Sequence, residues 1–100
     1  MKYHSIATKE SWKRIVDNKM RGAYGETDYK KKTIRINKKA HNKPRYGIAK
    51  KDATLINTII HEELHKKHPK RHEKTIRKQA RKTATHLSTK NKQRLYKIYS

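Results

Sequence analysis

The sequence predicts a single α+β domain, in which a short N-terminal helix and a small β-hairpin precede a buried helix and further C-terminal helices. Three observations support this prediction. The chain has 100 residues, which is an ordinary size for one domain. Apolar residues alternate with polar residues in part of the first half, whereas in the second half they recur at spacings of three and four. Capping and turn residues separate these stretches, and no internal repeat is evident.

The N-terminal stretch has the apolar spacing of a helix. Residues 8–20 are therefore expected to be helical, with Thr8 or Ser5 as the cap. The apolar residues that share one face of this helix are Trp12, Ile15, Val16 and Met20.

Residues 23–37 predict a hairpin or two short strands. Ile34 and Ile36 alternate with polar residues, which is the period of a half-buried strand. The following stretch, residues 38–51, contains Pro44 and Gly47 and predicts a loop.

The second half predicts three helices. The first is expected from an N-cap at Asp52 to about residue 68, because apolar residues surround most of it and Pro69 ends it. A second helix is expected over residues 70–87, and a last one after a cap at Ser88. The inner face of the 70–87 helix is formed by Ile76, Ala80, Thr83, Ala84 and Leu87. The last helix carries the apolar residues Leu95, Ile98 and Tyr99.

Residues 59–74 hold four of the seven histidines and three of the eight acids, in an otherwise basic chain. Within them, His61, Glu62 and His65 form the pattern H-E-x-x-H. Residues four apart lie one turn apart on a helix, so both imidazoles can reach one Zn²⁺. Glu62, about 100° round the helix, can act on a water at the metal without being a ligand. The sequence contains no cysteine, so any metal must use His nitrogens and carboxylate oxygens.

A catalytic zinc site needs a third protein ligand, and the nearby choices are His68, His72 and Glu73. His68 lies on the same face but too far along the helix axis to bind the same ion as His61 and His65. At about 100° per residue, Glu73 falls roughly 40° from the centre of the inward face of the next helix, and His72 roughly 60°. Glu73 is therefore the preferred third ligand, and His72 is the alternative.

The basic charge favours polyanions. The formal net charge is +21, and no acid follows Glu73, so residues 70–100 form a basic helical segment. The side chains that fall away from the inner face and can contact phosphates are Lys74, Arg77, Lys78, Arg81 and Lys82. Tyr96 and Tyr99 can stack on bases, although core packing suits at least one of them better. No base-reading motif is present, so binding of DNA or RNA is expected to be largely independent of sequence.

The pattern resembles the zincin metallopeptidases, and in particular very short gluzincin-like proteins. These have an H-E-x-x-H helix, a proline beyond it and a Glu opening the next helix, here His61, Glu62, His65, Pro69 and Glu73. The preceding strand and Ile76 also fit, so the resemblance covers about residues 23–87. It implies that His61, His65 and Glu73 are zinc ligands and that Glu62 is the general base. His72 keeps open a third His ligand, as in SprT-like proteases associated with DNA.

Two functions follow as expectations. The first is a zinc-dependent peptidase with one Zn²⁺ per chain, which acts on a protein or peptide substrate held by strand 33–37 through β-augmentation. Candidates for stabilising the oxyanion are Tyr29, Tyr46 and His86. The second is a nucleic-acid-binding protein whose metal site is structural or vestigial. Either protein is expected to be intracellular (cytoplasmic), because the sequence has neither the apolar core of a signal peptide nor a membrane span.

Overall fold

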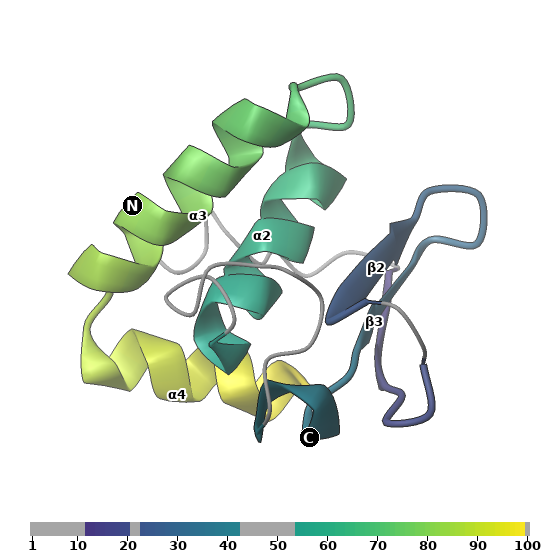
Figure 1. Ribbon diagram of the computed structural model, residues 1–100, viewed down its shortest axis with the longest axis horizontal. Helices are drawn as coiled ribbons and strands as arrows, with labels where there is room; N and C mark the ends of the chain where they lie inside the picture. The colour runs from purple at the N-terminus through teal and green to yellow at the C-terminus, as the bar shows by residue number, and fades with distance from the viewer. Residues whose placement is uncertain (1–11, 21–22, 43–53, 100) are drawn as a thin grey trace.

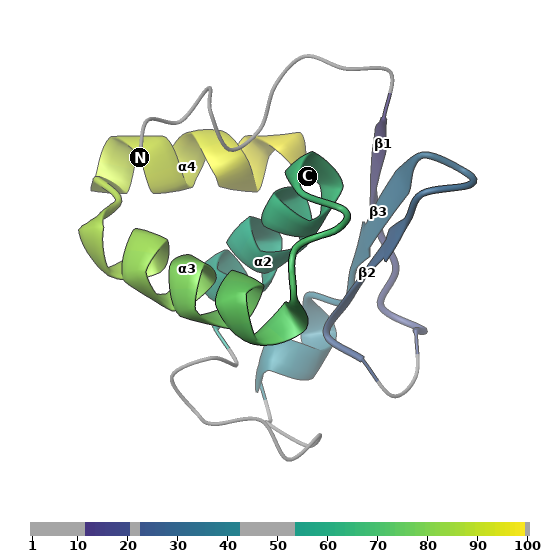
Figure 2. The same cartoon turned by 90° about the horizontal axis from the view of Figure 1, so that it is seen from above.

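The computed structural model describes residues 12–20, 23–42 and 54–99. A three-stranded sheet lies on one side of a central helix, and two further helices lie on the other side (Figure 1; Figure 2). The predicted α+β class is confirmed. In chain order the elements are β1 (Lys13–Val16), β2 (Gly25–Asp28), β3 (Thr33–Ile36), the 3-10 helix η1 (Lys39–Asn42), α2 (Leu55–Lys67), α3 (Glu73–His86) and α4 (Thr89–Ile98).

The sheet has the order β1-β3-β2, so β3 is its central strand. β3 pairs with β1 in parallel and with β2 in antiparallel orientation. A strand paired on both sides has no edge left to bind a peptide. The expectation that strand 33–37 holds an extended substrate is therefore wrong.

The N-terminal helix predicted over residues 8–20 is also wrong within the described residues, because residues 13–16 form β1. Arg14 and Val16 turn toward the interior, whereas Lys13 and Ile15 lie on the outside, and Ile15 is 39% exposed. This is the period of a strand. The sequence does not show a simple polar–apolar alternation here, because the inward-facing Arg14 is charged. Its charge is neutralised by Glu63. The proposed caps Thr8 and Ser5 lie outside the described residues.

The β2–β3 hairpin is confirmed. Ile34 and Ile36 are fully buried, as their alternation predicts. They stand opposite Thr27 and Gly25 in the antiparallel register, so these two residues share the buried side of the sheet. The turn ends at Lys32, which has a positive φ of 52°. Of the loop predicted over residues 38–51, residue 38 lies in a turn, positions 39–42 form η1, and residues 43–51 lie outside the described residues.

α2 begins later than predicted. Thr54 is its N-cap, and its side chain accepts a hydrogen bond from the backbone N–H of Asn57 at 3.3 Å. Asp52, the predicted cap, lies outside the described residues and two positions before the observed one. The helix ends before Pro69, as predicted, and it is buried round most of its circumference. Its buried residues are Ile56, Asn57, Thr58, Ile59, Ile60, Glu62, Glu63, Leu64 and Lys66.

α3 and α4 follow the predicted pattern. Ile76, Ala80 and Thr83 are the buried residues of α3. Ser88 caps α4 by accepting a hydrogen bond from the backbone N–H of Asn91 at 3.2 Å. Leu95 of α4 is buried in the same core. Within the part of the chain that the structure describes, no helix is both long and apolar enough to traverse a lipid bilayer.

A buried carboxylate joins three elements behind the central helix. Glu63 of α2 is fully buried, and its two oxygens accept hydrogen bonds from Arg14 of β1 at 3.0 and 3.1 Å. Tyr99, at the end of α4, donates a hydrogen bond of 2.5 Å to the same carboxylate, and Lys66 Nζ lies 3.3 Å from it. Burial alone would lower the pKa of Arg14, but Glu63 raises it, so the guanidinium remains charged. β1, α2 and α4 are thus joined by charge as well as by apolar contacts.

Replacing Arg14 with Met is expected to lower the free energy of unfolding by about 3 kcal/mol, because it leaves the buried carboxylate of Glu63 without its main counter-charge. Lys13→Met, an exposed change on the same strand, is the matched control and should change stability by less than about 0.5 kcal/mol. Urea denaturation followed by circular dichroism measures both. Equal effects of the two substitutions would contradict a specific role for the Arg14–Glu63 pair.

Candidate metal centre

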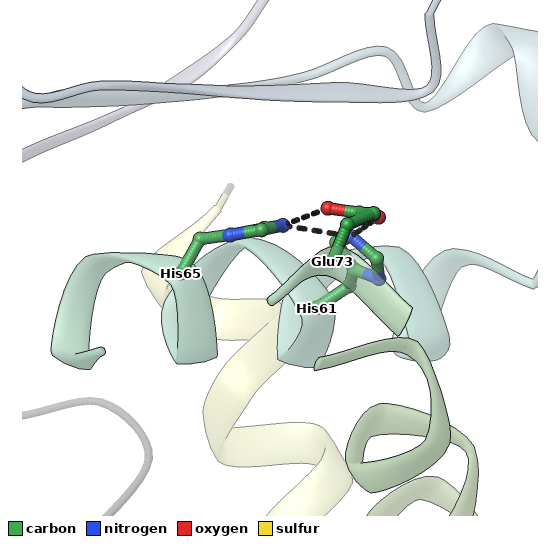
Figure 3. Close-up of side chains that lie close together, drawn as sticks. All are labelled: His61, His65 and Glu73. Atoms are coloured by element: carbon green, nitrogen blue, oxygen red, sulfur yellow. Dashed lines mark hydrogen bonds and ion pairs between the residues drawn. The ribbon is translucent and has the colours of Figure 1, made fainter. Parts of the chain in front are cut away.

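Three side chains from two helices converge at one point. His61 and His65 lie one turn apart on α2, and their Nε2 atoms are 3.1 Å apart. Glu73, the first residue of α3, places Oε1 2.8 Å from Nε2 of His61 and Oε2 2.6 Å from Nε2 of His65. Figure 3 shows the polar ends of all three side chains turned toward one another above the α2 ribbon. The preferred set of sequence-predicted ligands is therefore brought together.

The turn between α2 and α3 explains how Glu73 reaches this point. Pro69 cannot continue α2, so the chain reverses over residues 68–72. α3 then packs against α2, and Ile76 joins the core that contains Ile60 and Leu64. Because Ile76 lies about one turn after Glu73, its burial turns the carboxylate toward α2.

The two other candidate ligands have different places. His72 is exposed and acts as the N-cap of α3, where its Nδ1 accepts a hydrogen bond from the backbone N–H of Lys74 at 3.3 Å. His68 is the C-cap of α2, and its backbone N–H donates to the carbonyl of Leu64. Among the described residues, the group of potential metal ligands whose donor atoms lie close together contains His61, His65 and Glu73 only.

The cluster is enclosed on the α2 side and open on the α3 side. The side chains of His61 and His65 are less than one-fifth exposed, whereas that of Glu73 is 49% exposed. Burial lowers the pKa of His61, and this effect outweighs the opposing influence of the Glu73 carboxylate. His61 is therefore neutral at pH 7, which is the form that binds a metal.

The donor set fits a divalent metal ion. Two imidazole nitrogens and a carboxylate oxygen, all within 4.8 Å of one another, are the ligands of His₂Glu zinc sites, which keep a further position open. Without an ion, each imidazole can donate its Nε2–H to Glu73, but the two Nε2 atoms, 3.1 Å apart, are then both donors and cannot hydrogen-bond to each other. These two states differ in metal stoichiometry, and metal analysis separates them.

A second carboxyl group lies beside the cluster. Glu62 is buried, and the hydroxyl of Thr27 lies 2.7 Å from its Oε1 and 3.1 Å from its carbonyl oxygen. Burial raises the pKa of Glu62 to about 7; the Thr27 hydrogen bond lowers it, and the Glu73 charge adds to the rise. A carboxyl group with this pKa can both accept and release a proton near neutral pH.

No protein-family model, curated protein or solved structure matches this chain. Two imidazoles and a carboxylate can hold a metal, and the neighbouring carboxyl of Glu62 can exchange a proton with water. This combination suits hydrolysis assisted by a metal ion.

β2 supplies parts of the site that sequence reasoning missed. A methyl group at Gly25 would lie 2.9 Å from Cγ of Glu62 and 2.9 Å from Cγ2 of Thr58, so the absence of a side chain lets the strand approach α2. Thr27, two residues on, holds Glu62 in place. The hairpin register could have placed both residues on the side of Ile34 and Ile36, but only the packing of β2 on α2 identifies their partner.

Tyr29 lies next to the cluster, after the end of β2. Its hydroxyl donates a hydrogen bond to the backbone carbonyl of His65 at 2.8 Å, and its ring meets Trp12 edge-on at a centroid distance of 6.0 Å. Burial raises its pKa, with further contributions from the charges of Glu62 and Glu73. Of the other oxyanion candidates, Tyr46 lies outside the described residues. His86, at the far end of α3, is about 20 Å along the helix from Glu73.

The predicted basic residues lie on the outward side of α3. Those that are exposed are Lys74, Arg77, Lys78 and Lys82, and Arg81 is half-buried. Arg77 lies close to the cluster, with Nη2 3.9 Å from Oε1 of Glu73. These five residues form a basic stripe along α3, which begins at the edge of the candidate metal centre.

We expect purified protein to bind one divalent ion per chain, and His61→Ala to abolish binding because one of three ligands is removed. Glu73→Gln should also weaken binding strongly, whereas His72→Gln, which removes only a capping interaction, should leave the stoichiometry unchanged. Metal analysis after dialysis and calorimetric titration with Zn²⁺ measure these outcomes. Loss of metal in His72→Gln but not in Glu73→Gln would show that the third ligand is wrongly assigned.

Proposed function

We propose that this chain is a zinc-dependent metallopeptidase. The observation that supports the proposal best is the convergence of His61, His65 and Glu73 beside the buried carboxyl of Glu62. All but one of these groups come from a single turn and a half of α2, so their relative positions are fixed by helix geometry. The resemblance of the same residues to the zincin pattern agrees with this function.

Each residue has a distinct role in the proposal. His61, His65 and Glu73 would hold the ion, which supplies Lewis acidity to the peptide carbonyl and to the attacking water. Glu62 accepts a proton from that water at a carboxylate oxygen and later delivers it to the leaving amine. Thr27 orients Glu62 and does not take part in the proton transfer. Zinc is the preferred metal because the ligand set is rich in imidazole and does not provide the all-oxygen cage of calcium.

The substrate-binding strand is reassigned from β3 to β2. Within the described residues, β2 pairs with β3 alone, so its other side can accept an extended peptide through backbone hydrogen bonds. β2 is also the strand that contacts Glu62 through Thr27. A peptide paired with the outer edge of β2 would pass beside His61, His65 and Glu73, where the half-exposed Glu73 leaves the cluster accessible.

Glu62→Gln should retain zinc but reduce hydrolysis of a denatured protein by about 10²–10⁴-fold, because the amide cannot accept the proton from water. Lys90→Gln, which alters an exposed side chain on α4, is the control and should leave the rate within about twofold. Removing the metal with a chelator should stop hydrolysis, and adding Zn²⁺ should restore it. Rates measured by gel and by release of labelled fragments test this. Equal activity in Glu62→Gln and wild-type protein would refute the proposed base.

A second candidate function is nucleic-acid binding with a structural metal site. It is favoured by the exposed basic stripe of α3 and by the absence of any acid after Glu73. Phosphate contacts of this kind give affinity without sequence preference. The same surface could recruit a peptidase to proteins bound to nucleic acid, so the two functions are compatible.

Reversing Lys78, Arg81 and Lys82 to Glu should weaken binding to duplex DNA for all sequences alike. It should also reduce the slope of log affinity against log salt, by roughly 0.9 for each phosphate that the variant no longer neutralises. The matched control reverses the exposed Lys13, Lys30 and Lys31 on the sheet side, which changes the net charge equally. Fluorescence anisotropy at several salt concentrations provides the measurement. Equal weakening by both triple variants would show that net charge, and not the α3 surface, determines binding.

A further inference from the structure

Arg77 stands at the open side of the cluster, and its partner among the described residues is Glu73. It lies one turn after Glu73 on α3, and its side chain is 54% exposed. Its Nη2 is 3.9 Å from Oε1 of Glu73, which is longer than a hydrogen bond. The two Glu73 oxygens already contact His61 and His65 at 2.8 and 2.6 Å. Among the described residues, Arg77 therefore has a carboxylate nearby but no hydrogen bond to it.

The charges on the two sides of the cluster differ. On the β2 side, Glu26 and Asp28 lie on the sheet face opposite to Thr27, where Glu26 pairs with Arg35 at 2.7 Å and Asp28 accepts a hydrogen bond from the backbone of Lys31. On the α3 side, the exposed neighbours of Arg77 are Lys74 and Lys78, and no acid follows Glu73 in the sequence. An anionic group beside the cluster is thus attracted to the α3 side.

We infer that Arg77 binds a carboxylate of the substrate and makes the site selective for peptides with an acidic group close to the scissile bond. A guanidinium offers a planar fork that matches a carboxylate with two parallel hydrogen bonds. The carboxylate can be an Asp or Glu side chain or a free C-terminus, because both present the same two oxygens. This inference rests on the proposed peptidase function and specifies its substrate class.

A different role for Arg77 would be to hold Glu73 as part of the ligand set. An exposed pair at this spacing stabilises a helix by only about 0.3–0.5 kcal/mol, and the 3.9 Å separation does not fix the carboxylate. The two roles also have different consequences. Support of Glu73 would change metal affinity, whereas contact with substrate would change peptide affinity and KM at constant zinc content.

The test uses the zinc-loaded full chain carrying Glu62→Gln, so that peptides bind without being cleaved. The probes are labelled alanine-rich hexapeptides in which one Glu, or Gln as the neutral partner, is moved through the sequence. Each peptide is made with a free and with an amidated C-terminus. Anisotropy should show that one class of carboxylate binds roughly tenfold more tightly than its neutral partner. The position of the Glu, or the effect of amidation, identifies which carboxylate is recognised.

Adding Arg77→Gln should remove this preference and leave zinc content unchanged, whereas Lys90→Gln, which removes one exposed charge from α4, is the control and should keep it. Arg77→Lys should restore only part of it, because the planar fork is absent. A preference that survives Arg77→Gln, that falls equally in Lys90→Gln, or that is absent from the start would overturn the inference. Loss of zinc in Arg77→Gln would also overturn it, because it would show that Arg77 supports the metal ligand Glu73. Failure of wild-type protein to hydrolyse any peptide would instead refute the proposed function, because these binding measurements do not depend on cleavage.

Discussion

The buried carboxylate of Glu63 is the constraint on which the rest of the structure depends. It lies in the middle of α2, where hydrogen bonds from Arg14 and Tyr99 compensate for its burial. These contacts attach β1 and α4 to the same helix that carries His61 and His65. Two adjacent residues of α2 therefore have different roles: Glu62 lies beside the candidate metal centre, whereas Glu63 links α2 to β1 and α4.

This division of α2 explains how a chain with 31% hydrophobic residues maintains a defined site. The apolar core joins the sheet, α2, α3 and α4 through residues such as Ile36, Ile60 and Leu95, but it is small. The ionic cross-link adds directional contacts that apolar packing lacks. Directional contacts also position the site. Gly25 lets β2 approach α2 closely, and the hydroxyl of Thr27 then fixes the orientation of Glu62.

Sequence reasoning succeeded where one periodicity governed a whole element. The spacing of Ile76, Ala80 and Thr83 placed Glu73 toward α2, and the alternation of Ile34 and Ile36 identified the hairpin. It failed at β1, because an inward Arg14 resembles a surface residue until its partner on a distant helix is known. It also could not find the role of Gly25, which depends on the packing of a strand against a helix and leaves no local pattern.

The position of Glu63 also has a consequence for the order in which the chain folds. Its contacts with Arg14 and Tyr99 join residues that are 49 and 36 positions apart in sequence, and they bring both ends of the described chain to one point. The α2–α3 hairpin and the β2–β3 hairpin need far shorter loops to close. We therefore expect the ligand cluster to assemble early, within the local α2–α3 hairpin. The contacts of Glu63 with Arg14 and Tyr99, which join the two ends of the described chain to α2, should form last.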